Sequence, residues 1–445
     1  MRSTVNRALV ALVVAALVAV ALATTALAAP SGIPGPPPSA PGQAKKADQK
    51  AGAPLDAADA AKLKKQDLLL PAAQDLAGQA RDASSDIAGV SIDVDAGVVN
   101  VYRKNPKAPL HLAGAPVDVD VHQAKFSRGE MIAASEQVTQ DAKSLGDKHV
   151  AVESVGPTLD GSGLDVTVFA ADQSSLDQAT AVLRAKYGDI VANVHAESTK
   201  TSDANLYFNG FRFNDYAPWY GGDRINSGSA GCTDGFAATY NNAPAMLTAA
   251  HCGPVGTNWW NGPTSSGGWN FLGTTNYSNT STDIASIGVS STTNFINVGS
   301  DPQSPTQLYI NSWASPVVGQ YLCQSGSYTG ERCGLYVVDT GQYVCTSWFL
   351  WWCTSSMGPL ADVISAYGSG SPAAGHGDSG GPVYRYVYVN GSWQGVAEGL
   401  VHGQLTPNAQ SLYPAYFPDT LSCPAPEGWS NRCSSGFSFA HMPGY

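Results

Sequence analysis

The sequence predicts an all-β region after residue 200 and a small α+β region before it, and three observations support this division. All 8 Cys and all 10 Trp lie after residue 200, whereas the last lysine is Lys200. After that point, short runs rich in Tyr, Val, Thr and Trp are separated by Gly, Asn, Ser and Pro, which favours a barrel pair or a sandwich. Before it, helical and strand patterns alternate.

The charge distribution excludes several classes of protein. The chain of 445 residues has a formal net charge of −11, and the region after residue 200, with five Arg against thirteen Asp plus Glu, carries −8 of it. That region has no basic patch to neutralise phosphates, which argues against nucleic-acid binding. The charged fraction of 13 % is about half the globular average of roughly 25 %, which argues against a disordered or coiled-coil chain.

The first 28 residues have the pattern of a secretory signal peptide. Arg2 and Arg7 precede an apolar run, residues 8–23, and residues 26–28 (ALA) supply a small-residue cleavage pattern. The run is short for a membrane span, so we expect a secreted, extracellular protein that does not associate with membranes. An N-terminal anchor that is never cleaved is the alternative.

Residues 29–85 are expected to form a linker and a helical segment. Residues 30–50 are rich in Pro and Lys, which is typical of an extended linker. The Ala/Leu/Lys mixture of residues 56–80 favours a helix. Alternation over residues 90–102 then predicts a hairpin that turns at residues 95–97.

Residues 86–200 are expected to form the α+β domain, with the element order βαββαβ of a ferredoxin-like fold. Ser127 and Glu130 form a capping box ahead of the first helix, and Gly188 is placed to end the second. The strands are expected at residues 117–121, 149–155, 164–169 and 190–195, and the second helix at 175–187.

The cysteines predict disulfides, because an even count in an exported chain is typical of them. No pair has the two-to-four-residue spacing of a structural zinc site, so neither a metal nor another cofactor is expected. Among the 105 possible pairings of eight cysteines, four locally closed bridges are the simplest. These are Cys232–Cys252, Cys323–Cys333, Cys345–Cys353 and Cys423–Cys433.

Three segments of the β region carry the groups needed for nucleophilic acyl transfer. Residues 377–382 (GDSGGP) place Ser379 in a glycine-flanked turn, where backbone N–H groups can face a reacting carbonyl oxygen. A serine hydroxyl needs a neighbouring base, and His251 in residues 248–252 (TAAHC) is the candidate. Asp283 precedes an apolar strand, so its carboxylate can be buried against the imidazole and fix its tautomer.

The TAAHC and GDSGGP segments, with the Asp-Ile-Ala segment between them, resemble the chymotrypsin family of serine proteases, in particular its secreted bacterial streptogrisin and α-lytic protease type. The resemblance covers about residues 221–445 and implies two six-stranded antiparallel β-barrels with the active site between them. It implies that Ser379 is the nucleophile, His251 the general base and acid, and Asp283 its orienter. The N–H groups of Gly377 and Ser379 would form the oxyanion hole.

The resemblance also gives a role to the first 200 residues. Bacterial members of the family carry a pro-region that assists folding and inhibits the enzyme until it is cleaved. We therefore expect residues 86–200 to be a pro-domain, residues 201–220 a processing segment and residues 221–445 a catalytic domain. The mature enzyme is expected to be a monomer that acts on polypeptides; a catalytically silent binding module on the same fold is the alternative.

Two departures from the family pattern concern the support of the site. Gln324 stands where this branch usually has an arginine that pairs with the aspartate beside the nucleophile, here Asp378. A buried unpaired carboxylate is costly, so we expect another arginine to pair with it, Arg332 first and Arg224 second. The family's cysteine near residue 376 is also missing, which favours the pairing of Cys433 with Cys423 inside an apparent insertion, residues 406–423.

The predicted substrate pocket has an apolar floor. Ala373 takes the position where trypsin-like members have Asp, which argues against cleavage after Lys or Arg. Apolar or aromatic preference is favoured over acidic preference, although His402 lies near a histidine of glutamate-specific relatives. The expected substrate-binding residues are Ala373, His376, Val401, His402, Gly403 and Gln404.

One further segment, residues 346–352 (TSWFLWW), lies between Cys345 and Cys353. It is expected either to pack its aromatic side chains on the barrel or to form an exposed recognition loop.

Overall fold

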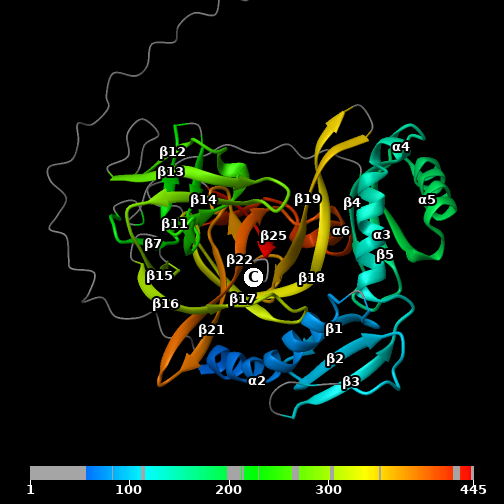
Figure 1. Cartoon of the computed structure of the whole chain (residues 1–445), viewed down its shortest axis with the longest axis horizontal. Coiled ribbons are helices and arrows are strands. Elements are labelled where there is room, and N and C mark those ends of the chain that lie inside the picture. Colours follow the sequence, from blue (N-terminus) through cyan, green and yellow to red (C-terminus); the bar gives the residue numbers. More distant parts are fainter. Residues whose placement is uncertain are drawn as a thin grey trace, which may run out of the picture. The chain divides into compact units, whose positions relative to one another are not determined.

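Strands predominate in the computed structural model after residue 218, as the sequence predicts (Figure 1). The structure describes residues 57–441 except 83, 111, 113–115, 198–211, 213–214, 229, 263–269, 301–304, 350–351 and 424–430. The expected signal peptide, the Pro-rich linker and most of the processing segment lie outside the described residues. None of the helices in the described part has the length and apolar character needed to cross a membrane.

The first part of the β region forms a seven-stranded sheet with the order β10-β11-β14-β13-β12-β8-β9. Its core contains Trp259, Met246 and Ile287, all buried. The strands are β8 (Arg224–Asn226), β9 (Gly231–Thr233), β10 (Ala237–Tyr240), β11 (Ala243–Thr248), β12 (Asn258–Asn261), β13 (Asn270–Asn279) and β14 (Ile284–Val289).

The second part forms most of a twelve-stranded sheet. Its strands from this region are β7 (Trp219–Gly221), β15 (Thr292–Val298), β16 (Thr306–Trp313), β17 (Tyr321–Gly326), β18 (Gly330–Phe349), β19 (Trp352–Ser365), β21 (Pro382–Val389), β22 (Ser392–Gly403) and β25 (Gly436–His441). The Asn-Gly pair at residues 390–391, between the β-rich runs 383–389 and 392–398, predicts a tight hairpin turn. The hairpin of β21 and β22 turns there, with positive φ at both residues. A small sheet joins β20 (Ala374–Gly375), β24 (Asn431–Ser434) and β23 (Leu421–Cys423).

The sheets differ from the two six-stranded barrels that the resemblance implies. The first has seven strands, and the second includes three strands from before residue 200, because β4 pairs with the long strand β18 through Val155 and Tyr343. A free edge strand exposes unpaired N–H and C=O groups. The edge of β18 therefore gains a partner from the preceding domain.

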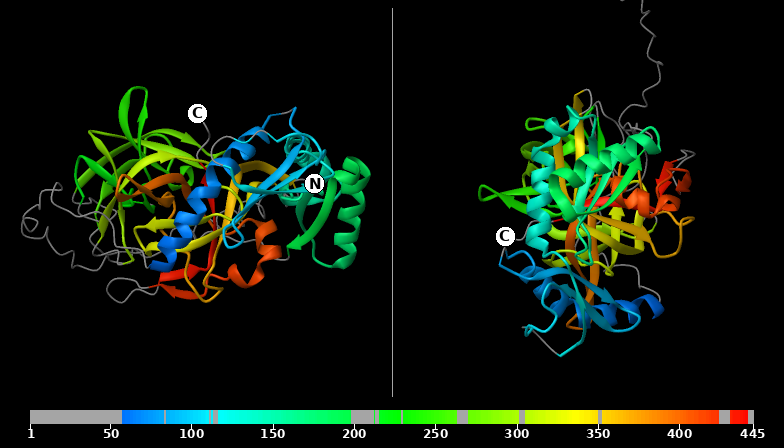
Figure 2. Two further views of the ribbon diagram at one scale, coloured as in Figure 1. Left: turned by 90° about the horizontal axis from the view of Figure 1, so that it is seen from below. Right: turned by 90° about the vertical axis from the view of Figure 1, so that its right-hand side faces the viewer.

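The helices and strands before residue 200 form where the sequence predicts them. Ser127 and Glu130 make the capping box of α3, and Gly188 ends α5 with a φ of 71°. The elements are α2 (Ala57–Gln79), β1 (Ile87–Asp93), β2 (Val98–Arg103), β3 (Asp118–Gln123), α3 (Arg128–Gln140), α4 (Ala142–Gly146), β4 (Ala151–Pro157), β5 (Leu164–Phe169), α5 (Gln173–Tyr187) and β6 (Val191–Glu197). Helices α3 and α5 pack on β4, β5 and β6 around Met131, Leu183 and Val166 (Figure 2).

The predicted ferredoxin-like sheet is wrong, although the order of the elements is right. In that fold all four strands share one sheet, but here β3 pairs in parallel with β2 in a separate three-stranded sheet. Strand β5 already has β4 on one side and β6 on the other, so it has no edge left for β3. The side chains of β3 are mostly exposed, which suits the edge of a small sheet.

Helix α2 lies against strand β21 of the β region (Figure 1), and its Gln66 reaches the first residue of β17. The amide of Gln66 bonds both backbone groups of Tyr321, accepting from its N–H at 2.6 Å and donating to its C=O at 3.0 Å. Asp67 forms an ion pair with Arg385 at 2.9 Å. These contacts hold helix α2 on the β region that follows residue 218.

The apparent insertion, residues 406–423, contacts strand β5 of the region before residue 200. It contains the short helix α6 (Pro407–Leu412), whose Asn408 is fully buried. The Asn408 side chain accepts a hydrogen bond from the Thr167 hydroxyl at 2.5 Å and donates to the Asp165 carbonyl at 3.0 Å.

The structure has four disulfides, and they join the pairs that the sequence predicts: Cys232–Cys252, Cys323–Cys333, Cys345–Cys353 and Cys423–Cys433. The third closes the hairpin of β18 and β19. Of the aromatic residues at its end, Trp352 is half-buried with Lys143 Nζ 5.8 Å from its ring centre, and the side chains of Trp348 and Trp351 lie outside the described part.

Candidate active site

His251 and Asp283 come together from two neighbouring strands of the seven-stranded sheet. His251 lies on a 3₁₀ turn, Ala250–Cys252, directly after β11, and Asp283 directly precedes β14, with which β11 pairs. His251 Nδ1 lies 2.8 Å from Asp283 Oδ2, and the His251 backbone N–H donates to Asp283 Oδ1 at 2.9 Å. Asp283 is fully buried, whereas the His251 side chain is 37 % exposed, so the imidazole is accessible to a substrate.

The backbone of Asp283 has a φ of 54°, in the left-handed region that non-glycine residues rarely adopt. Such conformations persist only where the surroundings hold them, and they cluster at functional sites. Burial opposes ionisation of Asp283, but the imidazoles of His251 and His402 outweigh it and hold the pKa of this carboxyl below its usual range. The carboxylate is therefore an anion facing His251.

Ser379 lies in the tight turn between β20 and β21. Gly377, two residues before it, has a φ of 90°, and a Cβ there would come within 2.3 Å of the Tyr328 ring. Only glycine suits both the dihedral angle and this close approach. The turn thereby holds the backbone of Gly377 and Ser379 in the conformation from which we expect an oxyanion hole.

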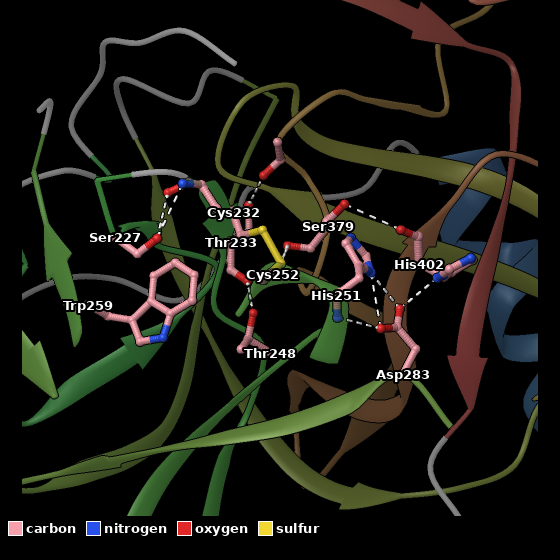
Figure 3. Close-up of a disulfide and its surroundings, with 12 residues drawn as sticks. Ser227, Cys232, Thr233, Thr248, His251, Cys252, Trp259, Asp283, Ser379 and His402 are labelled. Atoms are coloured by element: carbon pink, nitrogen blue, oxygen red, sulfur yellow. Dashed lines mark hydrogen bonds and ion pairs between the residues drawn. A yellow bond between two sulfur atoms is a disulfide. The ribbon is translucent and has the colours of Figure 1, made fainter. Parts of the chain in front are cut away.

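The structure brings Ser379 to the pair His251 and Asp283 through His402 (Figure 3). The Ser379 hydroxyl donates to the His402 carbonyl at 3.3 Å. The His402 ring packs edge-on against the His251 ring, with centroids 5.4 Å apart, and its Nδ1 lies 2.6 Å from Asp283 Oδ2. The three predicted catalytic residues thus all contact His402, a residue that the sequence analysis assigns to the substrate pocket: Ser379 contacts its carbonyl, and His251 and Asp283 contact its ring.

His402 is therefore not only the substrate-binding residue that the sequence predicts. Its ring contacts the carboxylate of Asp283 behind His251, and its side chain is 21 % exposed. The contact joins β22 to the loop before β14, which are 119 residues apart in the chain. No local pattern in the sequence indicates this contact.

The predicted arginine partner of Asp378 is wrong. Asp378 is fully buried and accepts hydrogen bonds from the backbone N–H groups of Tyr328, Thr329 and Gly375 and from the Thr329 hydroxyl. Burial raises the pKa of Asp378 to about 6. Four donors in a tight loop thus replace the ion pair that the sequence analysis expects.

Arg332 and Arg224 still interact electrostatically with Asp378, because the positive charge of each arginine favours the ionised form of the Asp378 carboxyl. The guanidinium of Arg224 lies 3.4 Å from the centre of the Tyr328 ring, a cation–π contact. Tyr328 in turn packs under Gly377. Arg224 therefore supports the turn at Gly377 through an aromatic ring.

Gln324, which stands in place of the family's arginine, is fully buried. Its amide donates to the Thr329 hydroxyl at 2.9 Å and to the Ala373 carbonyl at 3.0 Å. It thus fixes the loop that binds Asp378 to the segment expected to form the floor of the pocket.

The remaining predicted pocket residues lie around this turn. Ala373 is fully buried, and Val401 is buried with its backbone bonded to Gly380 and Gly381. Gly403 is half-buried and Gln404 is exposed. His376 is held by the carboxylate of Asp419 from the insertion, and this hydrogen bond raises the pKa of His376. The Asp419 contact is a further one that the sequence does not indicate.

Two sets of side chains in the described residues bring three potential metal ligands together. They are His251, Asp283 and His402, and Cys323, Glu331 and Cys333. The ligand atoms of the first set are engaged with each other in hydrogen bonds, and the cysteines of the second form a disulfide. Neither arrangement favours a metal centre.

The buried carboxyl of Asp362 gives a prediction about stability. It accepts hydrogen bonds from the N–H and hydroxyl of Thr406, and burial raises its pKa to about 6. The folded chain therefore binds a proton that the unfolded chain has released between about pH 4 and 6, so this group lowers stability as pH rises through that window. Asp362→Asn keeps a similar shape without the charge.

We expect Asp362→Asn to change the free energy of unfolding little at pH 4 and to raise it by about 2–3 kcal/mol at pH 7.5. Urea unfolding at both pH values measures this. Equal destabilisation at both pH values would contradict the assignment, because it would mean that the carboxylate is favoured as an anion.

Comparisons with known proteins find similarity in solved structures alone: no family model matches the chain, and no curated protein does. The chain is similar to Protease A of Thermobifida fusca, with 20 % identity over 50 % of this chain and 90 % of that one, at a TM-score of 0.33. It is similar to a glutamic acid-specific serine protease, with 21 % identity over 51 % and 93 %, at a TM-score of 0.34. An α-lytic protease homologue, N4, has 23 % identity over 44 % and 94 %, at 0.30. Likenesses with TM-scores this low carry no argument about activity, which depends on the site itself.

Proposed function

We propose that the chain is a secreted serine endopeptidase that hydrolyses peptide bonds through an acyl-enzyme. One observation carries the proposal: Ser379, His251 and Asp283 come from three distant segments and meet around His402. The buried carboxylate bonds the imidazole at 2.8 Å, and the serine lies at the glycine turn. Residues of these types, close together in this way, support the proposal because they are the ones that a serine hydrolase uses.

In this mechanism the Nδ1–H of neutral His251 donates to Asp283, which leaves Nε2 as the basic nitrogen. Ser379 Oγ forms a bond to the carbonyl carbon of the substrate while its proton passes to His251 Nε2. Collapse of the tetrahedral intermediate breaks the C–N bond, and the same proton goes to the departing amine. Water then repeats the two steps on the acyl-enzyme and regenerates the Ser379 hydroxyl.

The backbone N–H groups of Gly377 and Ser379 would stabilise the oxyanion of each tetrahedral intermediate. Gly377 can hold this position because its φ of 90° is open to glycine. The network under the turn, from Arg224 through Tyr328, supports the same backbone.

We propose apolar or aromatic preference for the residue before the cleaved bond. The floor residue Ala373 is apolar and buried, so a bound Lys or Arg would lose its hydration without gaining a partner there. The His402 ring contacts Asp283, which weakens the case for its reading an acidic side chain.

A panel of peptide p-nitroanilides that differ in this residue tests the activity and the preference together. We expect kcat/KM after Phe or Leu to exceed that after Arg by about 100-fold or more. Hydrolysis should be lost in Ser379→Ala. Strong cleavage after Arg or Lys would contradict the apolar floor, and no cleavage of any peptide would favour the silent binding module.

We further propose that the chain is made as a precursor, with the signal peptide at residues 1–28 and a pro-region that is removed. Arg212 is fully buried and donates to the carbonyls of Gly222 and Asn297 and to the Ser325 hydroxyl. These bonds tie the chain to the β domain from residue 212 onward. We therefore expect the mature N-terminus to precede Arg212, which N-terminal sequencing of the secreted protein tests.

The contacts of Asn408 support the role of the pro-region as a folding aid. We expect residues 201–445 expressed alone to yield little active enzyme. We expect Asn408→Ala in the full chain to lower the yield of active enzyme about tenfold, because it removes the buried bonds to Thr167 and Asp165 of the pro-region as well as one to Gln342 on β18. Asn311→Ala is the matched control, since Asn311 is exposed and bonds only Gln394 in the described contacts. Efficient folding of residues 201–445 alone would contradict the role.

A further inference from the structure

Asp283 has a second imidazole on its carboxylate. Oδ2 lies 2.8 Å from Nδ1 of His251 and 2.6 Å from Nδ1 of His402. Oδ1 accepts the His251 backbone N–H at 2.9 Å. Because Asp283 is fully buried, such donors replace the water that would solvate the charge.

We infer that His402 is a positioning residue of this site, which holds the Asp283 carboxylate through its Nδ1–H and so orients His251 indirectly. This inference rests on the proposed serine hydrolase function. It assigns the His402 ring to the positioning of the catalytic groups, whereas the sequence predicts that it binds the substrate side chain.

Nδ1 of His251 lies 2.8 Å from Oδ2 and 3.0 Å from Oδ1 of Asp283, and rotation of the carboxylate about its terminal bond would disturb this two-oxygen contact. A donor that fixes Oδ2 from the far side prevents this without a covalent constraint. Hydrogen bonds to a charged group are also the stronger kind, so a single such contact is sufficient to orient the group. His402 approaches from β22, whereas His251 approaches from β11, and the carboxylate is held between them.

The contact of His402 with Asp283 also bears on the charge that forms on His251 during the reaction. When His251 takes the proton of Ser379, it becomes a cation, and Asp283 stabilises it. A second cation on His402, whose ring centroid is 5.4 Å from that of His251, would compete for the same carboxylate. The other carboxyl that faces His402 is that of Asp362 on β19, and burial opposes its ionisation more than a charge on His402 would favour it.

The backbone of His402 contributes at the other end of the site. Its carbonyl accepts the Ser379 hydroxyl at 3.3 Å. One residue therefore contacts both the nucleophile and the carboxylate, and its ring packs against the base between them. A side chain that reached into the substrate pocket instead would leave Oδ2 of Asp283 with one imidazole donor.

Steady-state kinetics of His402→Leu and His402→Asn on one apolar peptide p-nitroanilide test the inference. Leu removes the donor, and we expect kcat to fall about 10- to 100-fold with KM changed less than about threefold. Asn offers an N–H near the position of Nδ1, and we expect it to recover most of kcat. The order of preference among substrates should stay unchanged in both variants.

Two kinetic outcomes would overturn the inference. A change in KM or in substrate preference with kcat retained would make His402 a pocket residue. An Asn variant as slow as the Leu variant would show that the N–H donor is not what matters. Thermal unfolding of both variants identifies any loss of kcat that comes from misfolding.

A resonance measurement keeps the inference testable even if the chain hydrolyses no peptide. In Ser379→Ala protein labelled with ¹⁵N-histidine, we expect two low-field Nδ1–H proton signals, one from His251 and one from His402. Adding His402→Asn should remove one and shift the other. A single low-field signal before that substitution would overturn the inference whatever the fate of the proposed activity.

Discussion

Ser379→Ala is expected to lower kcat by about 10⁶-fold, the loss typical of a removed nucleophile in a serine hydrolase. The alanine leaves no oxygen to form the acyl-enzyme, while the turn at Gly377 and the bond between His251 and Asp283 remain. Single-turnover hydrolysis of the preferred p-nitroanilide measures the effect, with KM expected to change little.

Ser392→Ala is the matched control, because Ser392 lies at the exposed β21–β22 hairpin and its hydroxyl donates to the Val389 carbonyl. It should keep full activity. If Ser379→Ala retained more than about one part in 10³ of kcat, a level above the residual expected without a nucleophile, Ser379 would not be the nucleophile.

Asp283→Asn has the second largest expected effect, a loss of about 10⁴-fold in kcat. The asparagine would present an N–H₂ group to one or both imidazoles, which would then accept through Nδ1. The ring proton of His251 would then be on Nε2, and an Nε2 that already carries a proton cannot accept the one from Ser379. Because the change affects the tautomer and not the pocket, we expect KM to stay within about threefold of its original value.

Circular dichroism separates this explanation from a loss of folding. The tautomer is wrong at neutral pH while the fold is intact, so far- and near-ultraviolet circular dichroism should match the parent protein. A decrease in kcat of less than tenfold would contradict the role of Asp283, because loss of a carboxylate that orients the base directly should lower kcat much more.

The parts of the fold that depend on local sequence could be predicted. The Asn390–Gly391 turn and the capping box at Ser127 are set by residues a few positions apart. The four disulfides follow from short spacings within the chain. The motifs around Ser379, His251 and Asp283 predict that these residues share one site, and the structure places the three segments close together.

The parts that depend on distant contacts could not be predicted. β3 leaves the expected sheet because β5 has no free edge, which is a property of three other strands. Asp378 is satisfied by the backbone of residues 328–329, about 50 residues away, and nothing in the sequence distinguishes those N–H groups from any others. The contact of His402 with Asp283 spans 119 residues and has no local signature.

Covalent labelling of the mature protein by a fluorophosphonate tests the central claim most directly. The reagent transfers its phosphonyl group to an activated serine, with loss of fluoride, and ignores ordinary hydroxyls at low concentration. Stoichiometric labelling that mass spectrometry locates on Ser379, and that His251→Ala abolishes, is the expected result. An intact folded protein that does not react, or that reacts at another serine, would contradict the assignment of Ser379, His251 and Asp283 as a catalytic site.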